Sequence, residues 1–165
     1  MSTRLYPNPS PTGTDDSHKS VSTATAGNTN RLSSIKDASV LVVEDNVANF
    51  VLIARLLGYM GIHCEWKTSG YEVVEYAHTL PRLDLILLDI RLPYEDGYGA
   101  LKKIRSSPLL KDTRVVAVTA EASSEQMNKA RAAGFDGFLG KPIDPDRFPD
   151  QVQRILAGEP VWELS

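Results

Sequence analysis

The sequence contains a single cysteine, no long apolar run and no excess of basic charge. Cys64 is that cysteine, so no disulfide can form within the chain, which suits a reducing compartment. Every apolar run is far shorter than the roughly 20 residues of a membrane-spanning helix. Residues 1–7 also lack the apolar stretch of a secretory signal. These absences predict a cytoplasmic protein without a membrane segment.

The whole chain has a formal net charge of −3, and the negative charge lies after residue 36. Residues 1–36 carry four basic and two acidic side chains, so the rest of the chain holds a net charge of −5. An acidic domain without a basic helix binds phosphate backbones poorly. We therefore expect no direct contact with nucleic acid.

Composition divides the chain into three parts. Residues 1–36 are rich in Ser, Thr, Pro, Gly and Asn, and they have too little apolar surface to offset their ordering entropy, which predicts a disordered tail. An organelle transit peptide is the alternative, but Asp15, Asp16 and the prolines argue against it. Residues 37–157 form the predicted domain, and residues 158–165 a C-terminal tail. Trp162 in that tail either docks on the domain or contacts a partner.

From Ala38 onward, apolar runs alternate with amphipathic stretches. The runs predict five strands, at 39–43, 62–66, 85–88, 115–118 and 137–140. The amphipathic stretches predict five helices, at about 46–60, 69–79, 98–106, 123–133 and 144–156. Strands that alternate with helices in this way are typical of an α/β fold, with a parallel sheet covered on both faces.

Polar side chains follow four of these strands at the point where each strand ends. They are Glu44 and Asp45 after the first, Asp89 after the third, Thr119 after the fourth and Lys141 after the fifth. The carboxyl ends of parallel strands meet at one edge of a sheet, which is where open α/β sheets bind their ligands. The sequence therefore predicts one site at this edge.

The residue types indicate phosphoryl chemistry with a hard metal ion. Three carboxylates in one crevice repel one another unless a cation lies among them. Oxygen ligands from a few carboxylates suit Mg²⁺. A carboxylate is also a nucleophile for phosphoryl groups, and a lysine ammonium and a hydroxyl can stabilise the transferred group.

Residues 39–157 resemble the receiver domain of two-component response regulators. The resemblance is carried by residues 40–46 (VLVVEDN), 88–93 (LDIRLP) with 96–97 (DG), 118–120 (VTA), 134–138 (GFDGF) and 140–142 (GKP). Every motif stands in the family's order, which is far more specific than one short match. It implies a flavodoxin-like, doubly wound sheet of five parallel strands in the order 2-1-3-4-5, with five helices.

The resemblance also implies a role for each residue of the site. Asp89 is expected to accept a phosphoryl group from a histidine kinase or a histidine phosphotransfer protein, and to lose it by self-dephosphorylation. The residues expected to hold Mg²⁺ are Glu44, Asp45, Asp89 and the backbone carbonyl of Arg91. The residues expected to respond to the phosphoryl group are Lys141, which pairs with it, Thr119, which moves to bind it, and Phe138, the aromatic switch that turns inward.

Further expectations concern the output of the domain. The bond between Lys141 and Pro142 is expected to be cis. The readout surface comprises the predicted fourth helix, fifth strand and fifth helix, and it can also support a homodimer. Because only nine residues follow Leu156, we expect a stand-alone receiver that signals through an unknown protein target.

The chain departs from the commonest family pattern at Phe138, where tyrosine is more usual, and at Gly140. Arg91 and Glu121 occupy variable positions beside Asp89 and Thr119. Because their charges are opposite, we expect them to pair over the phosphorylated aspartate and to slow attack by water.

Two other functions compete with the phosphoacceptor. A pseudo-receiver scaffold would never be phosphorylated, but its site would not need an intact acidic and basic set. An aspartate-based phosphohydrolase would want a second acid two residues after the nucleophile, where the chain has Arg91. The histidines are scattered without ligand spacing, so they predict no metal site.

Overall fold

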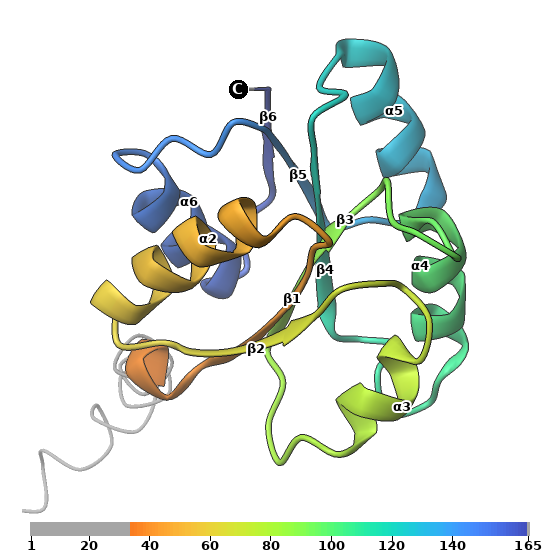
Figure 1. Cartoon of the computed structure of the whole chain (residues 1–165), viewed down its shortest axis with the longest axis horizontal. Helices are drawn as coiled ribbons and strands as arrows, with labels where there is room; N and C mark the ends of the chain where they lie inside the picture. The colour runs from red at the N-terminus through yellow and green to blue at the C-terminus, as the bar shows by residue number, and fades with distance from the viewer. Residues whose placement is uncertain (1–33, 165) are drawn as a thin grey trace, which may run out of the picture.

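The structure, a computed structural model, describes residues 34–164. Its centre is one sheet of six parallel strands in the order β2-β1-β3-β4-β5-β6 (Figure 1). The strands are β1 (Ser39–Val43), β2 (His63–Lys67), β3 (Leu85–Asp89), β4 (Arg114–Thr119), β5 (Gly137–Gly140) and β6 (Val161–Glu163). The predicted α/β class and the order of the first five strands are confirmed, and a sixth strand is added.

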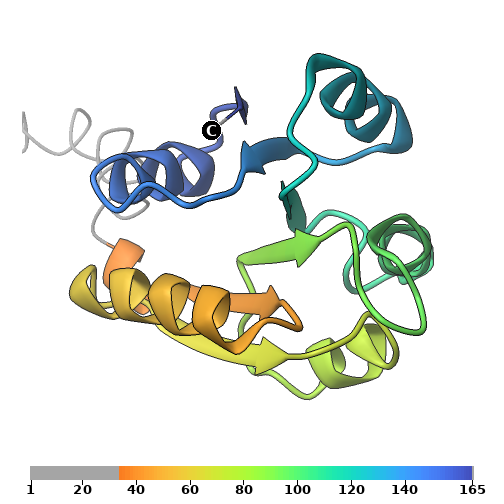
Figure 2. The ribbon, with the colours of Figure 1, turned by 45° about the horizontal axis from the view of Figure 1, so that its top comes forward.

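Five α-helices cover the two faces of the sheet (Figure 2). One face packs against α2 (Val47–Tyr59) and α6 (Phe148–Leu156), and the other against α3 (Val73–His78), α4 (Gly97–Ser106) and α5 (Ser124–Ala133). A short 3-10 helix, η2 (Ser34–Asp37), precedes β1. Among residues 34–164, no helix combines the length and apolar character needed to cross a membrane.

The strands are apolar on both sides because the sheet lies between two cores. In β1, Val40 and Val42 belong to the core beneath α2 and α6, whereas Leu41 and Val43 belong to the core beneath the other three helices. All five residues of β1 and all five of β3 are buried. Continuous apolar strands of this kind are what a parallel sheet with two covered faces requires.

Three helices begin directly after a side-chain cap. The side chains of Asn46, Asp96 and Ser123 each accept a hydrogen bond from the backbone N–H three residues ahead. Each bond satisfies one of the orphan donors in the first turn. These caps fix the starts of α2, α4 and α5, and α2 and α4 leave directly from the loops that follow β1 and β3.

Two helices begin later than the sequence pattern predicts. The last helix was expected from Asp144 but starts at Phe148, because the Asp144 carboxylate accepts a hydrogen bond from Asp146 N at 2.9 Å and forms a turn first. The second was expected from about residue 69 but starts at Val73. Glu72 before it has a φ of 66°, which is left-handed and cannot belong to a helix.

The sixth strand corrects the predicted number of five and part of the predicted tail. Val161–Glu163 pairs with β5 in parallel, with Trp162 opposite Phe138. Three residues after a Gly-Glu-Pro stretch carry too little periodicity to predict a strand. Of the segment 1–36 that was predicted to be disordered, residues 1–33 lie outside the described part of the chain. The other three residues belong to η2, where Ile35 packs against the core.

Candidate functional site

Asp89 is held rigidly at the carboxyl end of β3. This strand lies between β1 and β4, and the Asp89 residue is only 6% exposed. Its Oδ1 atom accepts a hydrogen bond from Arg91 N at 3.0 Å, and its Oδ2 atom accepts one from Lys141 Nζ at 2.8 Å. The carboxylate is therefore fixed in orientation by the turn that follows it and by Lys141, the residue directly after β5.

Gly97 allows the start of α4 to close tightly over this strand end. Gly97 N donates to Ile90 O at 2.7 Å. A Cβ atom at position 97 would lie 2.7 Å from Asp89 O and from Ile90 Cα, which is closer than real Cβ contacts. Only glycine fits here, and the close approach fixes the loop that carries Arg91.

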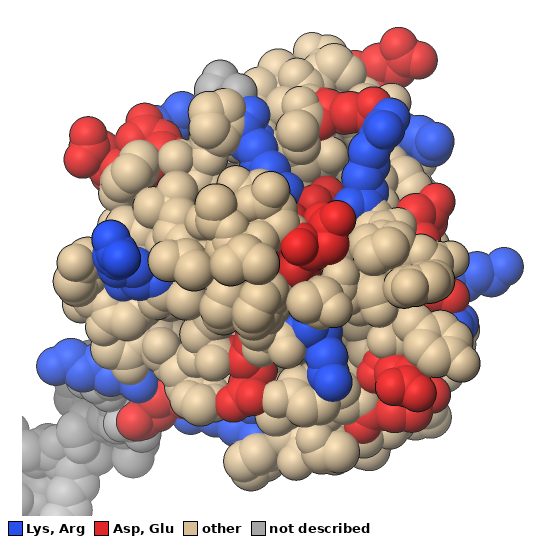
Figure 3. Space-filling view, viewed as in Figure 1, with Lys and Arg blue, Asp and Glu red and all other residues tan. Residues whose placement is uncertain are grey.

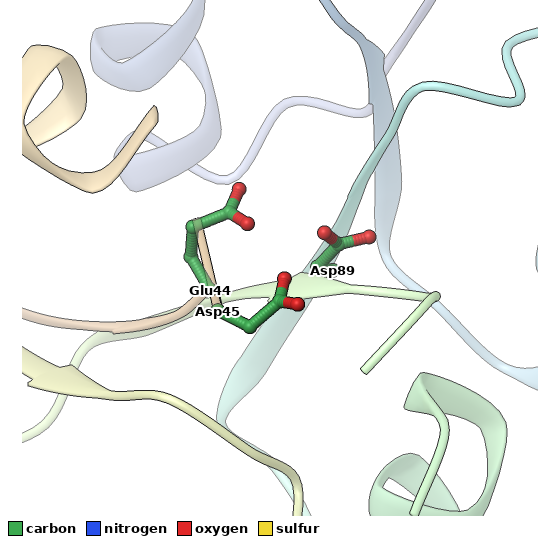
Figure 4. A group of neighbouring side chains, drawn as sticks. All are labelled: Glu44, Asp45 and Asp89. Carbon is green, nitrogen blue, oxygen red and sulfur yellow. The ribbon is translucent and has the colours of Figure 1, made fainter. Parts of the chain in front are cut away.

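Three carboxylates from two adjacent strand ends share one space (Figure 4). Glu44, Asp45 and Asp89 each offer an oxygen atom, and these three atoms lie within 4.8 Å of one another. Glu44 and Asp89 are buried, whereas Asp45 is exposed. Figure 3 shows acidic side chains gathered near the middle of the corresponding face of the molecule.

Lys141 supplies the positive charge closest to these acids. Its Nζ atom lies 2.5 Å from Glu44 Oε1 and 2.8 Å from Asp89 Oδ2. Burial lowers the pKa of Lys141, but the hydrogen bonds and charges of Asp89 and Glu44 outweigh it and raise this pKa above its usual value. Lys141 is therefore an ammonium group.

Glu44 has the opposite problem, because burial disfavours its charge. Burial raises the pKa of Glu44 above its usual value, and the hydrogen bond from Lys141 only partly offsets this. Three carboxylates and one ammonium leave the cluster short of positive charge. A donor set of oxygen atoms only, partly open at Asp45, fits a hard divalent ion such as Mg²⁺.

Thr119 and Lys141 come together because their strands are paired. Thr119 ends β4 opposite Gly140 of β5, and its carbonyl accepts a hydrogen bond from Lys141 N at 2.8 Å. The Thr119 hydroxyl is buried and accepts a hydrogen bond from Glu121 N at 3.2 Å. As an acceptor in this bond, the hydroxyl keeps its own proton for donation to an anion.

The predicted ion pair between Arg91 and Glu121 is present. It links the loop after β3 to the loop after β4. Both side chains are well exposed to solvent, at 72% for Arg91 and 43% for Glu121. The pair thus bridges the two loops that follow Asp89 and Thr119.

Phe138 lies inward in this structure. Its side chain is completely buried in the core beneath α3, α4 and α5. Its role as a switch stays a prediction. The bond between Lys141 and Pro142 is cis, as expected.

The sequence did not reveal how Glu44 is positioned. Trp66 Nε1 donates to Glu44 O at 2.8 Å, and the Trp66 ring stacks on Phe50 with 4.1 Å between ring centroids. Asn46 N also donates to the Glu44 carboxylate at 3.1 Å. The only signal in the sequence is a tryptophan near the end of an edge strand.

Sequence comparisons agree with this geometry. A family model described as "Response regulator receiver domain" matches residues 40–153. The signal transduction histidine-protein kinase BarA of Escherichia coli strain K12 is 41% identical over 120 residues, which are 73% of this chain and 13% of BarA. The polar-differentiation response regulator DivK of Brucella anthropi is 33% identical over 118 residues, which are 72% of this chain and 95% of DivK.

A solved structure gives the same result for the fold. The receiver domain of the sensor histidine kinase PA1611 from Pseudomonas aeruginosa PAO1 has a TM-score of 0.65 and 30% sequence identity. The match covers 74% of this chain and 98% of that domain. That structure is described as having a magnesium ion coordinated in its active site cleft.

Proposed function

The chain belongs to the family of response regulator receiver domains of two-component signalling, and we propose that its Asp89 accepts a phosphoryl group from a phosphohistidine. The observation that supports this most directly is Lys141 Nζ, which lies between the carboxylates of Asp89 and Glu44. The arrangement combines a fixed carboxylate nucleophile with an ammonium group beside it.

The transfer requires little from the protein beyond positioning and charge. An oxygen of Asp89 forms a bond to phosphorus while the bond from phosphorus to the imidazole nitrogen breaks, and the electron pair of that bond returns to the imidazole. Lys141 offsets the charge of the phosphoryl oxygens, and the Thr119 hydroxyl donates a hydrogen bond to one of them. Protein side chains therefore act here mainly through electrostatics.

A metal ion completes the charge balance in this proposal. Glu44, Asp45, Asp89 and the backbone carbonyl of Arg91 would hold Mg²⁺. When bound, the ion would neutralise phosphoryl oxygens that one ammonium group cannot neutralise alone. The oxygen-only cluster of three acids supports this choice.

The phosphoryl donor is a histidine kinase or a histidine phosphotransfer protein. The name of the relative BarA supports a kinase, since it is itself a histidine-protein kinase. Output would pass through protein contacts on the α5–β5–α6 face, made of Ser124–Ala133, Gly137–Gly140 and Phe148–Leu156. Stand-alone action, a homodimer on this face, self-dephosphorylation and a cytoplasmic location remain predictions from the sequence.

Mass spectrometry of the intact protein tests the proposal. Incubation with acetyl phosphate and Mg²⁺ should add one phosphoryl group to the wild type and none to Asp89→Asn. Asp112→Asn removes an exposed carboxylate from the loop before β4, and this variant should be labelled like the wild type. A wild type without adduct would support the scaffold instead, and repeated turnover of a small phosphoester would support the phosphohydrolase.

A further inference from the structure

The last strand, β6, lies on the α5–β5–α6 face, and its side chains contact both helices of that face. Figure 1 shows β6 beside β5 at the edge of the sheet. Toward α5, the guanidinium of Arg131 lies 4.4 Å from the ring centroid of Trp162. Toward α6, the Glu163 carboxylate accepts hydrogen bonds from Gln151 at 2.8 Å and Arg154 at 2.7 Å, and it also pairs with Arg147. The match to the family model ends at residue 153, before this strand.

We propose that the edge of β5 is a docking groove for an extended protein segment with an apolar, an aromatic and an acidic residue in succession. Val161, Trp162 and Glu163 fill this groove within the chain, and the partner's segment must replace them. The proposal rests on the proposed function in one respect only, namely that this face contacts the downstream protein.

The apolar position is defined by the floor of the groove. Val161 is 1% exposed and belongs to the core beneath α2 and α6. Opposite it lies Gly137, where a Cβ atom would come within 2.7 Å of Val161 O. The absence of a side chain at Gly137 thus lets a strand pair closely with β5, as a strand added in β-augmentation must.

The acidic position is defined by charge. Arg147, directly before α6, and Arg154 on α6 both pair with Glu163, and Arg131 on α5 covers the ring of Trp162. Without β6, these three cations would flank an unpaired strand edge. A replacing segment therefore needs a carboxylate for α6 and an aromatic face for Arg131, and tryptophan and arginine are residues that dominate binding energies at interfaces.

The strand is short enough to be exchanged. It has three residues in register with β5, whereas β1 and β2 share five. Gly158, Glu159 and Pro160 before it are exposed, and Pro160 has no N–H to extend the ladder. Short edge strands with few hydrogen bonds open at low cost compared with global unfolding.

A peptide with the sequence of residues 159–164 and a fluorescent label tests the proposal by anisotropy. The full-length wild type should bind it weakly, because the groove is filled. The double variant Trp162→Ala/Glu163→Arg, which removes both contacts, should bind it at least tenfold more tightly. Glu159→Arg makes the same charge change at an exposed neighbouring residue and should bind like the wild type. A peptide in which its own glutamate at position 163 is replaced by lysine should bind more weakly than the native peptide.

Hydrogen exchange of the same proteins reports whether β6 leaves the groove. Residues 161–163 should exchange faster in the double variant. Equal peptide affinity in all three proteins would overturn the proposal, as would no binding to a double variant whose β6 is released. Unchanged protection of β6 in the double variant would also overturn it, since the strand would then be a fixed part of the sheet. All titrations use unphosphorylated protein, so failure of phosphorylation at Asp89 leaves the result interpretable.

Discussion

At the scale of single residues, Lys141 determines the charge state of the site. It is the group that pairs with both buried carboxylates, Glu44 and Asp89. Both acids lost most of their contact with water on folding, and a buried carboxylate without a partner is costly. Lys141 therefore stabilises the folded protein, and in the proposed function it would pair with the phosphoryl group as well.

The exposed pair of Arg91 and Glu121 leads to a prediction about the lifetime of the phosphorylated state. If the pair shields the phosphorylated aspartate, Glu121→Ala should shorten its half-life about two- to fivefold, since exposed pairs contribute at most about 1 kcal/mol. Decay of the phosphorylated protein measured by intact mass provides the half-life. Glu125→Ala removes an exposed acid from the first turn of α5 and should leave the half-life unchanged. An unchanged half-life in Glu121→Ala would rule out shielding.

The residue scale also shows what the sequence could predict about the site. Glu44, Asp45, Asp89, Thr119 and Lys141 were predictable as neighbours, because each ends or closely follows a strand and parallel strands end at one edge. The contacts that hold these side chains in place could not be predicted. The bond from Trp66 to Glu44 depends on packing between β2 and α2, and no local pattern in the sequence encodes the direction of an indole ring.

At the scale of elements, the sequence predicted a strand or helix correctly where its local pattern was strong. β1, β3 and β4 were predictable because continuous apolar runs of their length occur only where both faces are covered. Asn46 and Ser123 gave correct helix starts because a cap acts within three residues. β6 could not be predicted, since its stability comes from Gly137 and from Arg131 and Arg154 on two helices rather than from its own three residues.

A substitution at Gly137 tests how much the pairing of β6 with β5 contributes to stability. Gly137→Ala places a methyl group 2.7 Å from Val161 O and 3.2 Å from Val116 Cγ2, so the strand must shift. Overpacking of this kind should lower the free energy of unfolding by about 1–3 kcal/mol. Urea denaturation measures the loss, and hydrogen exchange should show it centred on residues 161–163.

A matched control for this substitution is present in α2. A Cβ atom at Gly58 meets nothing within 4 Å, and the residue lies inside the helix. Gly58→Ala should therefore raise the free energy of unfolding by about 0.5–1 kcal/mol. If both variants were equally stable, β6 would not depend on close pairing with β5.

At the scale of the whole molecule, the sheet concentrates repulsive charge at one edge and tolerates it there. Two cores on either side of six strands hold the carboxyl ends of β1 and β3 together, so the acids cannot move apart (Figures 1 and 4). Their repulsion is thus a cost of folding that a cation bound there would relieve. If Mg²⁺ binds as we propose, the stability of the entire domain and metal binding at the site are linked.

Thermal unfolding in a Mg²⁺ titration measures that linkage. A free Mg²⁺ concentration 100-fold above Kd should add about 2.7 kcal/mol to the free energy of unfolding of the wild type, and EDTA should remove it. Asp45→Asn removes one exposed carboxylate from the cluster. It should be more stable than the wild type in EDTA, because repulsion falls, yet respond little to Mg²⁺. Asp112→Asn should respond like the wild type. A full Mg²⁺ response in Asp45→Asn would place the ion elsewhere, and a lower stability in EDTA would show that the acids do not repel as their spacing requires.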